Sequence, residues 1–208
     1  MKKMKVKLTF KESVLGTSPN NAEIYREFIG SKSPDAASIE DEVASLGADA
    51  VTEKGTTVFP RLEDGTPFLY DYQVKGFFKD TCGALSRVVV KDEKGKKKTA
   101  LNESGKLTAY KKTIDGLIFV QPRKIPFENY GEIGLLQRPL RAQTAQGERI
   151  SLACSEEIPA GATVTFDILM LSDEHEAAVR EWLDYGELRG IGQWRNASHG
   201  QFTWEEIK

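Results

Sequence analysis

The sequence predicts an α+β fold in which helices cover one face of an antiparallel sheet. Several segments alternate apolar and polar residues with the two-residue period of half-buried strands. Two longer segments carry apolar residues at helical spacing. Along the chain these segments follow the order strand, helix, strands, strand, helix, strand, which suits a sheet with its helices on one side.

The chain begins with a predicted strand, Lys5–Phe10, whose alternate residues are apolar. Residues 20–50 then predict an insertion of two helices. In the second of these, Pro34 suits the first turn and Gly47 suits the position just past the end. The insertion is polar, and we expect it to stand outside the main sheet.

The next part of the chain predicts short strands, a helix and a charged excursion. Residues 56–70 contain an Asp-Gly turn between two short strands. Residues 71–85 predict a helix, although its two internal glycines weaken it by about 1 kcal/mol each. Residues 88–112 are rich in charge and predict a hairpin or a loop. The expected buried face of the helix is Val74, Phe77, Phe78, Cys82 and Leu85.

The second half of the chain is richer in strands. Leu117–Val120 predicts a fully buried strand, and residues 131–161 predict a strand, a loop and a second strand. Ala162–Met170 alternates most regularly of all, so we expect it near the centre of the sheet.

The last helix and strand complete the predicted fold. Ser172 suits the N-cap of a helix over Asp173–Tyr185, and Gly186 is expected to end it. Residues 201–207 predict a final strand. This order of elements predicts a ferredoxin-like, RNA-recognition-type sheet with helices on one face.

Composition limits the possible functions. The 208 residues are 39% hydrophobic and 29% charged, which suits one soluble domain with insertions. The net charge of −2 excludes a basic field over the whole molecule, so any polyanion site requires local clustering of cations. No apolar run approaches ~20 residues, so we expect no membrane span and no membrane partner. The first residues predict a strand and not a signal peptide.

The cysteines and histidines argue against a metal site. Cys82 and Cys154 lie far apart with no close spacing, which indicates reduced thiols in a cytoplasmic protein. His175 and His199 are the histidines of the chain, too few for a His/Cys cage. We therefore expect no metal and no cofactor.

A glycine-rich segment, GELRGIGQWRNASHGQF, follows the last predicted helix at residues 186–202. Glycines allow positive φ angles, and successive exposed N–H groups in such a turn form a concavity that binds anions. Arg189 and Arg195 supply forked donors that suit phosphate, and Trp194 supplies a flat face on which a base can stack. The segment predicts an anion-binding loop; the alternative is a long loop with solvated arginines.

Five segments of the chain resemble, in the same order, segments of the RAMP superfamily, the repeat-associated RNA-binding proteins of CRISPR systems. The stretch LRGIGQWRNASHGQF resembles the family's glycine-rich loop, which follows the last helix of a ferredoxin-like fold. The others are VLGTSPNN, LEDGTPFLYDYQVKGFFKDTC, GLIFVQPRKIPF and LQRPLRAQTAQGERISLACSEEIPAGATVTFDILML. The resemblance is greatest to the backbone subunits that line CRISPR effector complexes, and it covers most of the chain outside 20–50 and 88–112.

The resemblance implies a single RAMP-like domain over 1–208 that binds single-stranded RNA. In the family, cations at the start of the first helix lie near the guide RNA backbone, and an arginine-containing loop reaches the nucleic acid. Backbone-tracking sites need such cations and backbone N–H groups but no base code. The expected RNA-binding residues are Lys75, Lys79, Arg138, Arg141, Arg189, Gly190, Gly192, Trp194, Arg195, His199 and Gly200.

Each of these groups has an ordinary structural alternative. The two lysines can be solvated on a helix surface. Arg138 and Arg141 can form surface ion pairs with Glu132 or Glu148. The Lys94–Lys98 run suits a polyanion contact, although such runs are more often solvated loops.

The sequence also departs from the family. YDYQV stands where the family has a Pro-Gly-Ser-Ser-like turn, and its Asp71 brings a negative charge to that position. Some members cleave RNA with an aspartate in the loop after the first strand. The insertion replaces that loop here, and Asp35, Asp41 and Asp49 qualify by proximity alone. We therefore assign no catalytic residue.

Three functions stay open on the sequence. The first is a non-catalytic subunit that binds guide RNA and other CRISPR-complex subunits, with or without self-association. The second is a phage-encoded mimic of such a subunit that inhibits a CRISPR or other defence complex by protein–protein contact. The third is a RAMP-type endoribonuclease that uses His199 as general acid or base, although no partner for that residue is evident.

Overall fold

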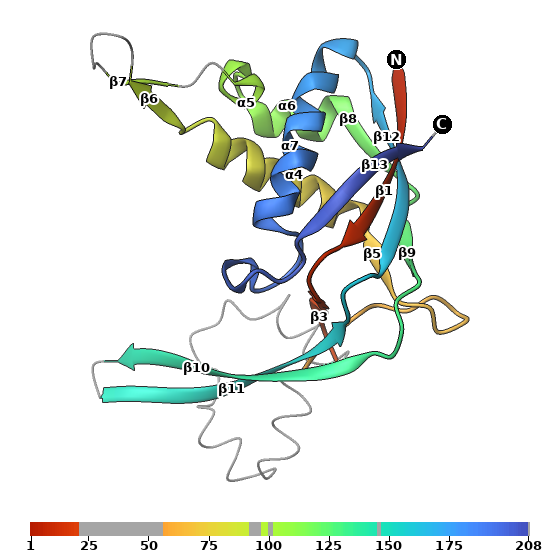
Figure 1. Cartoon of the computed structure of the whole chain (residues 1–208), viewed down its shortest axis with the longest axis vertical. Coiled ribbons are helices and arrows are strands. Elements are labelled where there is room, and N and C mark those ends of the chain that lie inside the picture. Colours follow the sequence, from red (N-terminus) through yellow and green to blue (C-terminus); the bar gives the residue numbers. More distant parts are fainter. Residues whose placement is uncertain (21–55, 92–96, 100–101, 145–146, 208) are drawn as a thin grey trace.

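The computed structural model describes residues 1–20, 56–91, 97–99, 102–144 and 147–207 (Figure 1). Apart from Asn20, the predicted two-helix insertion at 20–50 lies outside the described residues. So does Gly95, around which the charged excursion was expected to turn.

The main sheet has the predicted ferredoxin-like arrangement. Its strands are β1 (Lys2–Phe10), β5 (Phe68–Tyr70), β8 (Ile118–Gln121), β9 (Lys124–Glu128), β12 (Thr163–Met170) and β13 (Phe202–Ile207). The order β13, β1, β12, β8 is antiparallel throughout, and β9 and β5 extend the sheet beside β12. The predicted strands near the start, middle and end of the chain therefore lie in one sheet, and the predicted fold class is confirmed.

Alternation along the two central strands explains their position. β1 buries every second residue, and β12 does the same against it. Because side chains alternate across a strand, this pattern directs one apolar face of the sheet toward the helices and leaves charged residues such as Lys3 and Lys7 on the other face. The buried residues of the two strands are Met4, Val6, Leu8, Phe10, Val164, Phe166, Ile168 and Met170.

Two helices, α4 (Asp71–Leu85) and α7 (Glu176–Arg189), cover that apolar face (Figure 1). The bounds of α4 agree with the predicted helix. A short 3-10 turn, η1 (Asp173–His175), precedes α7, and the Ser172 hydroxyl caps it by accepting the Glu174 N–H at 3.4 Å. The helices meet through apolar side chains that also pack on the sheet, so one core holds all three elements together.

The charged excursion ends in two short helices. β6 (Val89–Lys91) and β7 (Lys97–Thr99) form an antiparallel pair, and α5 (Glu103–Lys106) and α6 (Tyr110–Leu117) follow. Residues 88–112 thus contain a strand pair, as the sequence predicts, and also α5 and the start of α6, which the sequence does not predict.

α5 is tied to α7 by buried polar contacts. The Glu181 carboxylate accepts the backbone N–H groups of Glu103 at 3.0 Å and Ser104 at 2.9 Å. The indole N–H of the fully buried Trp182 donates to the Ser104 hydroxyl at 2.9 Å. Glu181 therefore satisfies N–H groups that the start of a helix leaves unpaired, and it anchors the end of the excursion to the core.

A second sheet lies beside the first. Its strands are β2 (Val14–Leu15), β3 (Ser18–Pro19), β4 (Thr57–Val58), β10 (Gly134–Thr144) and β11 (Gly147–Ile158). β10 and β11 form a long hairpin that extends away from the helices (Figure 1). Arg138 and Arg141, predicted in a loop, lie on β10 instead, because the backbone pairs with β11 along the whole segment.

Two further predictions about element ends are wrong. Gly186 lies inside α7 and does not end it; a Cβ at this position would be 2.1 Å from Cζ of Phe202, so the glycine lets that ring pack on the helix. The segment predicted as a fully buried strand is only half buried. Leu117 belongs to α6, and Phe119 on β8 is 40% exposed.

The Asp64–Gly65 turn is present, with Gly65 at φ +86°, but it does not join a paired hairpin. The strands on either side of it, β4 and β5, belong to different sheets, and a single bridge links Arg61 to Pro67. The turn therefore connects the two sheets, which a local sequence pattern does not reveal.

The cysteine prediction agrees with the structure: Cys82 and Cys154 are buried and free. Within the described ranges, no cluster of three or more His, Cys, Asp or Glu side chains is arranged to bind a metal ion. Among the helices that the structure describes, none is long and apolar enough to cross a membrane.

Candidate functional site

The glycine-rich loop, residues 190–200, begins where α7 ends. Gly190 has a φ of +73°, and a Cβ there would lie 2.5 Å from the His199 carbonyl oxygen. Gly200 has a φ of +74°, and its Cβ would lie 1.9 Å from the Ile191 carbonyl oxygen. Both positions therefore require glycine, on grounds of backbone angle and of space.

Backbone hydrogen bonds close this loop and fasten it to the segment between β1 and β2. The Ile191 N–H donates to the Gly200 carbonyl at 2.9 Å, and the Gly200 N–H donates to the Ser13 carbonyl at 2.8 Å. Gly192, at φ +93°, lies nearer the second sheet. The loop is thus a compact structure with a fixed position, and its exposed groups are held in place before any ligand arrives.

Two arginines at the loop converge on one carboxylate of α4. Arg189 Nε donates to Asp80 Oδ2 at 3.1 Å, and Arg195 Nη1 donates to the same oxygen at 2.7 Å. Arg189 also donates to the Asn196 amide oxygen at 2.7 Å. The three charged groups are all about one-third exposed or less, and together they carry a net charge of +1.

A stack of three side chains joins the loop to β10. The Arg138 guanidinium carbon lies 4.5 Å from the centre of the Trp194 ring. The Trp194 ring in turn is stacked on His199, with centroids 5.2 Å apart and an interplanar angle of 14°. His199 Nδ1 is 2.9 Å from the Ser13 hydroxyl. The cation–π contact therefore joins β10 to the loop, and the hydrogen bond of His199 joins the loop to the segment after β1.

Arg138 is a cation that lies almost fully buried within the described part of the chain. It is only 8% exposed, and one of its nitrogens donates to the Gln193 amide oxygen at 3.3 Å. Within the described residues, its Nε and Nη1 atoms are buried without a hydrogen-bond partner. Burial lowers the pKa of Arg138, but a guanidinium stays protonated in proteins. A buried cation with unused donors favours an anion or a polar group beside it.

The stack changes the expected role of Trp194. Its ring is 41% exposed, but Arg138 and His199 already cover part of its surface. A base can stack on the remaining surface or replace one of these neighbours. Part of the Trp194 ring surface on which the sequence predicts that a base stacks is therefore covered by two protein side chains.

The two predicted lysines lie on another side of α4. Lys79 forms an ion pair with Asp115 of α6 at 2.6 Å, and Lys75 lies 4.0 Å from the same carboxylate. Lys75 also donates to the Asp115 carbonyl at 3.1 Å and lies over the Phe119 ring at 5.2 Å. A helix turns about 100° per residue, so Lys75 and Asp80 are separated by about 140° around α4.

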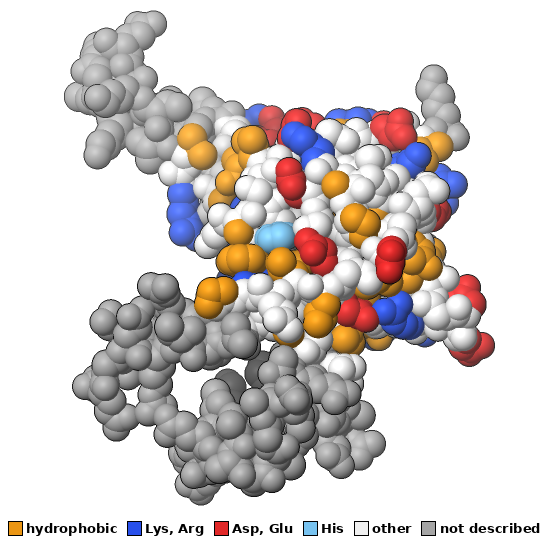
Figure 2. Space-filling model, turned by 60° about the horizontal axis from the view of Figure 1, so that its bottom comes forward, with side chains coloured by type: hydrophobic (Ala, Val, Ile, Leu, Met, Phe, Trp, Pro, Cys, Tyr) orange, Lys and Arg blue, Asp and Glu red, His pale blue; other side chains and the backbone are white. Residues whose placement is uncertain are grey.

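The structure thus brings together only some of the predicted residues. Lys75 and Lys79 form a separate group, and the side chain of Arg141 lies outside the described part of the chain. On the face shown in Figure 2, Lys and Arg side chains are dispersed among acidic and apolar ones, with a histidine near the middle. The predicted residues that the structure gathers around the loop are Arg138, Arg189, Gly190, Gly192, Trp194, Arg195, His199 and Gly200.

Sequence reasoning missed the acceptors that organise these cations. Asp80 and Asp115 face their partners only because α4, α6 and α7 pack together, and nothing in their spacing indicates it. Gln193 was also missed, although it lies inside the quoted loop. Its amide N–H group donates to the Gly16 carbonyl at 2.6 Å and to Thr57 at 3.2 Å, which joins the loop to the second sheet.

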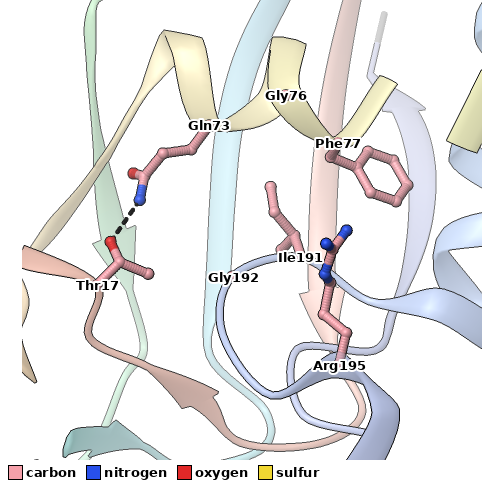
Figure 3. A pocket seen from close by; sticks show the side chains of 7 residues that line it. All are labelled: Thr17, Gln73, Gly76, Phe77, Ile191, Gly192 and Arg195. Atoms are coloured by element: carbon pink, nitrogen blue, oxygen red, sulfur yellow. Dashed lines mark hydrogen bonds between the residues drawn. The ribbon is translucent and has the colours of Figure 1, made fainter. Parts of the chain in front are cut away.

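A pocket of about 310 Å³ lies between α4 and the loop (Figure 3). Gln73 and Thr17 form one side of it through a 2.7 Å hydrogen bond, and Arg195 lies on the opposite side. The lining residues are Thr17, Gln73, Gly76, Phe77, Ile191, Gly192 and Arg195.

Comparisons with known proteins identify the fold. No protein-family model matches the sequence, and no curated protein matches it. Among solved structures, a chain of a Type III-B Cmr-beta complex bound to cognate target RNA is 9% identical with a TM-score of 0.50. The match covers 100% of the present chain but only 60% of the other, so this chain spans less than two thirds of that protein's length.

Two other solved structures are similar. Cmr6 from Pyrococcus furiosus is 9% identical, covers 97% of both chains and has a TM-score of 0.50. A chain of a Type IV-B CRISPR complex is 14% identical over 99% of this chain and 90% of the other, with a TM-score of 0.48. At such identities the likeness to the Cmr-beta chain and to Cmr6 establishes a shared fold.

Proposed function

We propose that this chain is a RAMP-superfamily protein that serves as a non-catalytic, RNA-binding backbone subunit of a CRISPR-type effector complex. In this role it grips single-stranded guide RNA through the glycine-rich loop and its neighbouring cations, in the cytoplasm, as one domain over 1–208. Its other partners are subunits of the same complex.

The observation that carries this proposal is the convergence at the glycine-rich loop. Arg189 of α7, Arg195 of the loop and Arg138 of β10 meet there on a ferredoxin-like scaffold. Phosphate contacts come mainly from Arg and Lys side chains and from backbone N–H groups, and this site supplies the arginines and the backbone N–H groups of a glycine-rich loop. A strand whose phosphates approach the loop finds these donors fixed in place.

Asp80 holds the arginines ready for this contact. Two guanidinium groups share one carboxylate oxygen, so each keeps donors in its fork for a phosphate. Partly exposed ion pairs contribute little to stability, so phosphate contacts can replace them at low cost. Lys75 and Lys79 extend the proposed contact along another side of α4, and Arg141 extends it along β10.

The contacts of His199 suit a supporting role in the loop. Its Nδ1 atom lies 2.9 Å from the Ser13 hydroxyl, and its ring is stacked on Trp194. Neither neighbour is a charged group that would tune the histidine as a general acid or base. We therefore infer that His199 supports the loop. In the endoribonuclease alternative, purified protein would cleave single-stranded RNA and His199→Ala would abolish the cleavage.

One observation favours the mimic instead. Each of Lys75, Lys79, Arg189 and Arg195 is already paired with a carboxylate, and the chain as a whole is slightly acidic. Such a surface suits protein–protein contact as well as RNA. In that alternative, the same loop contacts the protein surface that normally meets a backbone subunit.

The salt dependence of RNA affinity tests the proposal. For four phosphate contacts to a single strand, log affinity should fall with log salt at a slope near −3. Replacing Arg189 and Arg195 together by alanine should weaken binding for every sequence and flatten the slope by about 1.4. Fluorescence anisotropy with labelled single-stranded RNA measures both. A wild-type protein without salt-sensitive affinity would contradict the subunit role and favour the mimic.

A further inference from the structure

We infer that the pocket between α4 and the glycine-rich loop binds one unstacked nucleobase of the bound strand. The inference rests on the proposed RNA-binding role and adds a specific site to it. Phosphate contacts hold the strand without regard to its bases, whereas this pocket takes a single base out of the strand.

The size and walls of the pocket suit a flat aromatic ring. Its volume of about 310 Å³ lies at the lower end of the range for small-molecule sites, about 300 to 1,000 Å³. Phe77 and Ile191, each 3% exposed or less, form its apolar floor, and Gly76 and Gly192 keep it open, because neither has a side chain to fill the space. Apolar walls with a few fixed polar groups are typical of ligand pockets.

The polar side of the pocket is the amide of Gln73. Its Oε1 atom accepts the Tyr70 N–H at 2.7 Å, which fixes the orientation of the amide, since only the oxygen can accept. Its Nε2 atom donates to the Thr17 hydroxyl at 2.7 Å. An amide has two acceptor and two donor positions, so these two bonds leave one of each. An adjacent donor and acceptor pair matches the edge of a base, as glutamine does when it reads adenine.

Arg195 completes the site on the opposite side from Gln73 (Figure 3). Asp80 holds its Nη1 atom, which fixes the guanidinium beside the pocket. A base held by Gln73 and Thr17 would bring its own phosphate toward this cation. The pocket therefore combines a base-edge contact with a phosphate contact, and it suits one nucleotide of a longer strand.

A larger residue at position 76 can close the pocket without straining the protein. A Cβ at Gly76 would meet no atom within 4 Å, so a side chain there enters open space and does not strain the protein. Gly76→Ala and Gly76→Leu should block the pocket in two steps while both favour the helix. Gly116→Leu is the matched control: this glycine lies in α6, is equally unobstructed, and does not line the pocket.

The probe is single-stranded RNA that carries 2-aminopurine, whose fluorescence rises when it leaves its stacked neighbours. Its 2-amino group and the adjacent ring nitrogens present the donor and acceptor pair that the Gln73 amide can meet. Wild type and Gly116→Leu should both produce this rise on binding. Gly76→Leu should remove it and weaken binding by about fivefold, the loss expected for one base contact, while the salt slope stays unchanged. Gly76→Ala should lie between them.

The outcomes separate this inference from the proposed function. If wild type binds RNA with the expected salt slope but Gly76→Leu keeps full fluorescence and affinity, the base pocket is wrong and the RNA-binding role stands. If wild type binds no RNA, the proposed function fails first. Adenosine monophosphate is the second probe. We expect millimolar amounts to leave the fluorescence rise intact, and full competition would assign the pocket to a free nucleotide instead.

Discussion

The two sides of α4 carry the same charges in different surroundings. On one side, Lys75 and Lys79 meet the carboxylate of Asp115; on the other, Arg189 and Arg195 meet that of Asp80. The lysine side lies next to α6 and β8. The arginine side lies next to a closed glycine loop, a buried third arginine and a pocket.

This difference shows that charge alone does not define a binding site. Lysine presents a flexible point charge, whereas a guanidinium presents several donors in a rigid plane that suits phosphate. At the loop, backbone bonds and the stack on Trp194 fix the positions of these donors before binding. Pre-organisation lowers the entropy lost on binding, so we assign the main contact to the arginine side.

The largest expected effect comes from the loop glycine that approaches another backbone segment. Gly200→Ala would place a Cβ 1.9 Å from the Ile191 carbonyl oxygen at a φ of +74°. The clash and the left-handed backbone together should cost about 3 kcal/mol of unfolding free energy. Urea unfolding followed by tryptophan fluorescence measures this loss.

Gly116→Ala is the control for that measurement, because its Cβ meets open space. A loss in Gly200→Ala no greater than that in the control would mean that the loop is not fixed as described. The comparison between the two sides of α4 would then lose its physical basis.

Removing each carboxylate compares the two sides directly. Asp80→Asn removes the negative charge beside two arginines but keeps an amide oxygen that can still accept from them, so it should tighten RNA binding by about 1 kcal/mol at low salt. Asp115→Asn frees the two lysines and should tighten it less. Titrations of labelled RNA with each variant at about 50 mM salt, where charge screening is weak, measure both affinities. Equal gains would show that the strand uses both sides of the helix.

Replacing the lysines should change the salt dependence of RNA affinity less than replacing the arginines. The double variant Lys75→Ala and Lys79→Ala should flatten the salt slope by less than the value of about 1.4 expected for two phosphate contacts. The reason is that Asp115 directs both lysines toward α6, away from the loop. A change as large as that of the arginine pair would overturn this ranking.

The smallest expected change in stability is at the buried arginine. Arg138→Met keeps an apolar chain beside Trp194 and removes a buried cation whose Nε and Nη1 have no partner among the described residues. We expect the unfolding free energy to stay within about 1 kcal/mol of wild type, while RNA affinity falls. A large loss of stability, measured by urea unfolding, would show that Arg138 serves the fold and not a ligand.

Much of the fold is readable from local patterns. The alternation in β1 and β12 and the apolar stripe of α7 each depend on residues a few positions apart, so the two periods are visible in the chain itself. The sequence predicts that α7 ends at Gly186, whereas the helix continues to Arg189 and ends before Gly190. Gly186 and Gly190 look alike in sequence, but in the structure the Phe202 ring packs against the first, and the second has the positive φ that follows the end of the helix.

The candidate site was also predicted only in part from the sequence. The sequence alone indicated a glycine loop with two arginines, because their residue types carry that chemistry wherever they lie. It placed Arg138 in a loop, since the strand there is defined by its hydrogen bonds to β11 and not by a clear apolar period in its own residues.

The sequence by itself determined the strands β1, β12 and β13, the two main helices and the composition of the loop. Each of these follows from backbone preference and from an apolar period of two or 3.6 residues. Only the tertiary structure decided that Asp80 would hold two arginines, that Asp115 would hold two lysines, and that Gln73 and Thr17 would form one side of a pocket. These contacts join residues tens of positions apart, and they arise only when the helices and the sheet pack around a common core.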